Sequence, residues 1–233
     1  MILGPTGLTD YFNFDDMPTE QIIEQMNTVL GTAGLSVIQL FANMISFVMA
    51  MMALVPVLMF ILKAKAEEKA IRAELIFATR ESRTKYLAGL VVISFACAVL
   101  VQLAQAIGLY SMVPSMLDNP SDLPLSFLLQ SVMVYVPALW IMGGLAVLMV
   151  GLFPKRVGWI WAYYGFTFFV MMYARMLPEI AWLANLTPLG WVPQLPMDEI
   201  NGIVMALMSV GGIALAAVGI MFYNRRDINA ITH

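Results

Sequence analysis

Five long apolar stretches constrain this chain most, because each is long enough to cross a bilayer as a helix. They are residues 36–62, 86–112, 125–153, 157–177 and 200–223. A hydrocarbon core about 30 Å thick takes roughly 20 apolar residues of helix. Barrel strands need alternating hydrophobicity, whereas residues 44–62 are apolar on every face. With 61% hydrophobic and 12% charged residues, the sequence predicts an all-α integral membrane protein, a bundle of five transmembrane helices.

The distribution of charge predicts how the bundle is oriented. Eleven of the 12 Lys and Arg residues fall in three clusters, at 63–85, 155–156 and 225–226, whereas ten of the 15 acidic residues lie in the alternating segments. Short basic loops stay on the cytoplasmic side of a membrane. We therefore expect a multi-pass protein of a bacterial cytoplasmic membrane, with the N-terminus outside, the C-terminus inside and a cytoplasmic tail at 224–233.

The first 35 residues are expected to form an external segment. Pro18 and Thr19 ahead of Glu20 predict the start of a helix lying at the membrane surface. The segment has no basic region followed by an apolar one, so it does not resemble a signal peptide. Its export is easier to explain if an earlier span precedes it, in a longer polypeptide or in a separate gene product.

The chain lacks the residues that most catalytic and metal sites require. His233 is the single histidine and Cys97 the single cysteine, so haem, zinc and disulfide sites have no partners here. No glycine-rich phosphate loop occurs. We expect no catalytic residue, no metal and no cofactor in this chain, so any ATP and Mg would be bound by a partner ATPase subunit.

The cytoplasmic segment 63–85 is rich in Ala, Glu, Lys and Arg and has no Gly or Pro, so it should be helical. Ile71 and Leu75 mark a narrow apolar stripe among charged neighbours. The segment is either a solvated hairpin loop or a docking helix for a cytoplasmic partner.

Residues 67–83 resemble the corresponding loop of ABC transporter permeases of the polyketide-antibiotic exporter type. Shorter matches follow in the same order at 137–154, 177–182, 187–193 and 224–227. Two positions depart from the family pattern, with Ile71 in place of Gly and Arg80 in place of Pro. The resemblance therefore covers roughly residues 62–227.

The resemblance implies the C-terminal half of a permease, in which each half has six helices. The five spans match helices two to six, and residues 178–199 match a segment of short external helices. The partners implied are cytoplasmic ATPase subunits and a second half-permease, beside membrane lipid and without nucleic acid. The implied ATPase-docking residues are Glu67, Glu68, Ile71, Arg72, Glu74, Leu75, Arg80 and Arg83.

Several residues within the spans have two interpretations each. Pro56 and Pro137 should kink their helices, as hinges or as static packing features. Ser209, Gly212, Ala216 and Gly219 form a stripe suited to close helix contact or to a substrate path. Arg175 and Glu179, spaced i and i+4, form an ion pair near the headgroups or an outer gate. Four polar residues line a cavity or make interhelical hydrogen bonds: Asn43, Gln102, Gln105 and Gln130.

Three classes of function remain open. The first is the permease subunit of an ATP-powered exporter, a transport subunit without an ATPase site, moving a hydrophobic or amphipathic drug, antibiotic or lipid-like substrate outward. The second is an ion-coupled carrier or channel, which would normally place ionisable residues near the membrane midplane. The third is a non-transporting structural or assembly subunit of a membrane complex. The resemblance favours the first.

Overall fold

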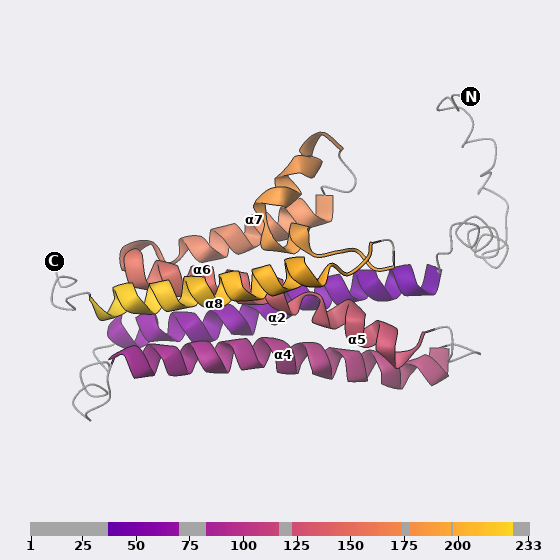
Figure 1. Ribbon diagram of the computed structural model, residues 1–233, viewed down its shortest axis with the longest axis horizontal. Helices are drawn as coiled ribbons and strands as arrows, with labels where there is room; N and C mark the ends of the chain where they lie inside the picture. The colour runs from indigo at the N-terminus through magenta and orange to yellow at the C-terminus, as the bar shows by residue number, and fades with distance from the viewer. Residues whose placement is uncertain (1–36, 70–82, 117–122, 174–177, 197, 226–233) are drawn as a thin grey trace.

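The computed structural model describes residues 37–69, 83–116, 123–173, 178–196 and 198–225, and every regular element among them is a helix. Four helices lie side by side in an elongated bundle, and a fifth leaves it at an angle (Figure 1). The four are α2 (Val37–Lys69), α4 (Arg83–Met116), α6 (Val136–Leu152) and α8 (Gly202–Asn224). The fifth is α7 (Trp159–Tyr173), and the shorter helices are α5 (Leu125–Met133), η2 (Pro154–Arg156), η3 (Pro178–Leu186) and η4 (Pro188–Trp191).

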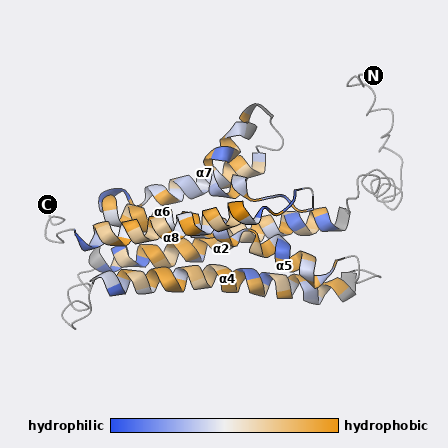
Figure 2. Cartoon of the chain, in the orientation of Figure 1, coloured by the Kyte–Doolittle hydropathy of each residue, from blue (hydrophilic) through white to orange (hydrophobic). Residues whose placement is uncertain are grey.

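Within the ranges that the structure describes, four helical stretches are long and apolar enough to cross a membrane: Gln39–Glu67, Thr84–Val113, Leu125–Leu152 and Gly202–Asn224. They confirm four of the predicted spans. The other predicted span, 157–177, contains α7, whose 15 residues extend about 22 Å, and residues 174–177 lie outside the described part. Hydrophobic residues predominate along the length of the helices (Figure 2), as expected where lipid surrounds them. The chain is therefore a multi-pass membrane protein.

The helix of the first span continues beyond its predicted boundary. The prediction ended this span at residue 62, but α2 runs without a break to Lys69. The added residues are Lys, Ala and Glu, which are good helix formers in water as well. The helical prediction for the segment 63–85 thus holds at 63–69 and at 83–85, where α4 begins, while 70–82 lie outside the described residues, as does the surface helix predicted within residues 1–35.

The basic residues of the described part gather at one end of the bundle. α2 and α8 end there, α4 begins there, and η2 turns the chain from α6 into α7 at the same end (Figure 1). Asp198 and Glu199 lie toward the opposite end, just before α8. This separation matches the predicted cytoplasmic and external sides.

Helix α6 is the centre of the bundle. Twelve of its 17 residues are buried, whereas α8 buries only Met208, Gly212, Ala216, Gly219 and Tyr223, all on one face. That face packs along α6, the most extensive contact between any two described helices. The rest of α8 is apolar and exposed, with Ile203 at 74% and Leu207 at 66%, and so is suited to lipid.

Glycines let the backbones of α6 and α8 touch. A Cβ atom on Gly212 would lie 2.7 Å from the carbonyl carbon of Trp140, and one on Gly219 would lie 2.6 Å from that of Val147. Gly144 and Gly151 of α6 face Gly212 and Gly219 equally closely. On each helix the two glycines are seven residues, or two helical turns, apart. The two helices therefore run parallel and stay in register along this contact. The predicted packing role of the stripe on α8 is confirmed, and we call this contact the glycine seam.

The third predicted span is broken where Pro137 enters it. α5 ends at Met133 and α6 begins at Val136, because proline cannot donate a helical hydrogen bond to the preceding turn. The buried side chain of Gln102 of α4 donates to the carbonyl oxygen of Val132 over 2.8 Å. The predicted disruption at Pro137 is thus confirmed, and a neighbouring helix supplies a donor beside the break.

The glycine seam predicts a position-specific cost for one methyl group. Gly212→Ala should lower the unfolding temperature of the chain in detergent, because its Cβ meets backbone and overpacking costs about 1–3 kcal/mol. Gly211→Ala is the matched control, since a Cβ there meets nothing within 4 Å. Thermal unfolding of the two variants tests the seam, and equal unfolding temperatures would contradict it.

Candidate functional site

Helix α2 contains Pro56, where the backbone of a span is weakest. Proline has no N–H, so the carbonyl of Met52 loses its helical donor. Two neighbouring helices bond to α2 on either side of this point. The Tyr164 hydroxyl of α7 donates to the carbonyl of Met51 over 3.2 Å, and the Ser94 hydroxyl of α4 donates to the carbonyl of Val57 over 2.8 Å. α2 is therefore held to α7 before the proline and to α4 after it.

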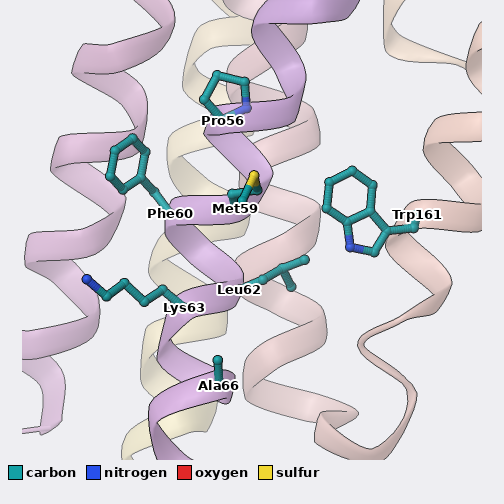
Figure 3. A pocket seen from close by; sticks show the side chains of 7 residues that line it. All are labelled: Pro56, Met59, Phe60, Leu62, Lys63, Ala66 and Trp161. Carbon is teal, nitrogen blue, oxygen red and sulfur yellow. The ribbon is translucent and has the colours of Figure 1, made fainter.

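A groove of about 510 Å³ lies along α2 from Pro56 toward the basic end. Figure 3 shows Phe60 and Lys63 on one side of α2 and Trp161 of α7 on the other. The residues that line it are Pro56, Met59, Phe60, Leu62, Lys63, Ala66 and Trp161. Its volume falls within the range of small-molecule sites, roughly 300–1,000 Å³. Its lining is apolar apart from the Lys63 ammonium and the indole N–H.

The two aromatic residues that join α7 to this region belong to one cluster. Trp161 lies edge-on to Tyr164, with ring centroids 6.0 Å apart and ring planes at 86°. Trp161 forms the wall of the groove, and the Tyr164 hydroxyl fixes α7 to α2 near the Pro56 end. The distance between α7 and α2, and so the width of the groove, depends on this pair.

The far end of α2 is tied to the segment that follows η4. Asn43 donates to the side chain of Gln194, with Nδ2 and Oε1 3.4 Å apart. η4, which precedes this segment, is tightly built, because the Gly190 N–H donates to the Thr187 hydroxyl oxygen at 3.2 Å and a Cβ on Gly190 would collide with the backbone of Ala184. The sequence match at 187–193 therefore marks a compact turn beside the outer end of α2.

The four polar residues predicted to line a cavity lie in different surroundings. Gln102 of α4 makes a hydrogen bond to Val132 beside α5, and Asn43 of α2 makes one to Gln194 in the irregular segment after η4, both through their amide nitrogens. The side-chain amide atoms of Gln105 are buried and have no hydrogen-bond partner in the described part of the chain. Gln130 is exposed on α5. None of the four lines the groove, and their role in a substrate path stays a prediction.

Most of the predicted docking and gate residues lie outside the described residues. Those outside are Ile71, Arg72, Glu74, Leu75, Arg80 and Arg175. The backbones of Glu68, Arg83 and Glu179 are helical, and their side chains are not described. Glu67 lies half-buried near the end of α2. Within the described ranges, no three His, Cys, Asp or Glu side chains gather to hold a metal ion.

Sequence reasoning missed three residues that build this site: Ser94, Tyr164 and Trp161. Pro56 was recognisable as a helix breaker, but the residues that bond beside it come from other helices, 37 and 113 positions along the chain from their acceptors. A serine or tyrosine in an apolar span signals a hydrogen bond but does not identify the acceptor. Trp161 carries no signal of a groove, because a tryptophan near the end of a span is common at a membrane boundary.

Comparison with known proteins agrees with this architecture. No individual curated protein matches the chain. Residues 13–224 match the model of the C-terminal domain of the multidrug efflux system permease Rv1217c. The match includes all the described helices and confirms the resemblance found in the loop at 67–83. The chain therefore belongs to the family of the C-terminal domain of this multidrug efflux permease.

Proposed function

We propose that this chain is the permease subunit of an ATP-powered exporter in a bacterial cytoplasmic membrane. It moves a hydrophobic or amphipathic substrate outward, a drug, an antibiotic or a lipid-like molecule. Separate ATPase subunits bind ATP and Mg and dock on the segment 63–85, and a second half-permease completes the pathway. The observation that supports this most is the continuity of α2 from the membrane into that segment.

The length of α2 makes it suitable as a lever. Its 33 residues extend about 50 Å, and the hydrocarbon takes up about 30 Å. Lys63, Lys65 and Glu67 lie on the last turns at the basic end. Because no loop interrupts the helix there, a force on the docked segment acts directly on the span.

Pro56 divides this lever into two parts with different attachments. The part toward the basic end is bonded to α4 through Ser94, and the part beyond Pro56 is bonded to α7 through Tyr164. α2 and α4 are the two helices that the segment 63–85 connects. Closure of the ATPase subunits would therefore move the basic ends of α2 and α4 together. This hinge movement would change the width of the groove between α2 and α7.

The glycine seam provides the fixed body for this movement. α6 and α8 touch through their backbones, and close-packed interfaces resist small deformations. α7 makes few contacts with α6 by comparison. In the groove, the side chain of Met59 is 61% exposed. Methionine is unbranched and flexible, so it suits a surface that adapts to apolar molecules of different shapes.

Charge reversal in the docking segment should separate the chain from its ATPase. Arg72→Glu and Glu74→Arg each oppose the charges of the partner surface, and we expect at least a severalfold loss of ATPase recovered with the affinity-tagged chain. Membrane insertion should be normal, because both positions precede the apolar part of α4. Asp198→Lys, at the opposite end of the bundle, is the control.

Wild-type recovery of the ATPase and wild-type efflux in both docking variants would remove the segment 63–85 as the docking site. Loss of the ATPase with Asp198→Lys as well would mean that the effect comes from net charge or folding.

The hydrogen bond between α7 and α2 should control transport more than assembly. Tyr164→Phe removes a donor worth about 0.5–1.5 kcal/mol, so the balance between the two arrangements should shift by about two- to tenfold. Efflux of a fluorescent hydrophobic drug should change while the complex is recovered in full. Tyr163→Phe is the matched control, since its hydroxyl donates to Leu186 of η3, away from α2.

Equal efflux by the Tyr164→Phe and Tyr163→Phe variants would show that the bond to Met51 does not bias the cycle. The hinge at Pro56 would then lose its main support.

A further inference from the structure

The length of the groove matches one leaflet of a membrane. Pro56 and Ala66 mark its ends, and ten residues of helix rise about 15 Å, half of a hydrocarbon core of about 30 Å. The candidate span runs over Gln39–Glu67, so Pro56 lies close to its midpoint and Ala66 at its basic end. The groove therefore extends from near the membrane midplane to the surface predicted to be cytoplasmic.

The polarity of the groove lining changes along its length as it does along a phospholipid molecule. Pro56 and Met59 make the deep part apolar, and the charged Lys63 lies in the part near the surface. Figure 3 shows the Lys63 side chain extending from α2 on the side away from Trp161. A lysine near the end of a span extends its ammonium toward the headgroups, and a tryptophan is favoured at the same level.

The charge around the mouth favours an anionic headgroup. Lys155 and Arg156 of η2, two residues before α7, are exposed at the same end of the bundle. Basic pockets between transmembrane helices on the cytoplasmic side bind anionic lipids. A drug-like molecule would need several converging polar groups to orient it, and the described lining offers only the Lys63 ammonium and the indole N–H.

We propose that this groove holds one anionic phospholipid of the cytoplasmic leaflet. Its phosphate lies at Lys63, and one acyl chain runs past Leu62 and Met59 toward Pro56, against Trp161. The lipid fills the space between α2 and α7 at rest and must move when the groove changes width. This site goes beyond transport and does not depend on an ATPase partner.

The test counts lipid on the complex purified through this chain in mild detergent. The complex is incubated with equal amounts of phosphatidylglycerol and phosphatidylcholine with the same acyl chains, purified again by size exclusion, and the lipid per chain is measured by mass spectrometry. We expect about one phosphatidylglycerol per chain, retained in preference to phosphatidylcholine. Lys63→Gln should lower this retention about fivefold.

Two matched pairs of variants test separately how the headgroup and the acyl chain contribute to lipid retention. Arg225→Gln removes an exposed cation at the same end of the bundle, just after α8 and outside the groove, and should retain phosphatidylglycerol as the wild type does. Met59→Trp fills the groove and should lower retention of both lipids. Met52→Trp places the same bulk on α2, at a residue 65% exposed that does not line the groove, and should have no effect.

Equal retention of both lipids by the wild type, or unchanged retention by Lys63→Gln, would overturn the proposal. A disulfide between Phe60→Cys and another membrane chain of the complex would also overturn it, because the groove would then be a protein interface. Absence of an ATPase from the purified complex would count against the transport function and leave the lipid measurement valid.

Discussion

The structure depends on one constraint, that a backbone in hydrocarbon must find hydrogen-bond partners within the protein. In the described spans regular helix meets it, except where a proline lacks the N–H that a helix needs, as Pro56 and Pro137 do. Near each proline, at carbonyls other than the one that loses its helical donor, a side chain from another helix bonds to the backbone: Gln102 to Val132 near Pro137, and Tyr164 to Met51 and Ser94 to Val57 around Pro56. The weak points of the spans are therefore also the points where separate helices are connected.

Two kinds of helix contact divide the bundle into a fixed and a movable part. The glycine seam brings α6 and α8 into backbone contact, with no room for a Cβ atom at the facing glycines. α2 and α7 share the hydrogen bond from Tyr164 to Met51, and the groove lies along α2 between Pro56 and the basic end. In a membrane the hydrophobic effect does not hold helices together, because lipid tails are as apolar as the side chains. Such a contrast in packing therefore decides which helices can move. The proposed export cycle uses that contrast.

The sequence predicts features that depend on one segment at a time. Apolar length predicted the spans, the small residues of α8 predicted a packing face, and Pro137 predicted a break. The partners of these features could not be predicted, because they lie on other spans. Gly144 and Gly151 look like ordinary glycines in an apolar helix until Gly212 and Gly219 are placed against them. For the same reason Tyr164 and Trp161 gave no sign of the groove.

The central claim is that ATP moves the basic end of α2 relative to α7 while the glycine seam stays fixed. Distances between spin labels at Ala66→Cys and Ala162→Cys, both exposed positions, test it most directly in the complex with Cys97→Ala. A second pair, Leu152→Cys and Met221→Cys, reports on α6 and α8. The account predicts that ATP with vanadate shifts the first distance distribution and leaves the second unchanged. A first distribution that does not respond to ATP would contradict it.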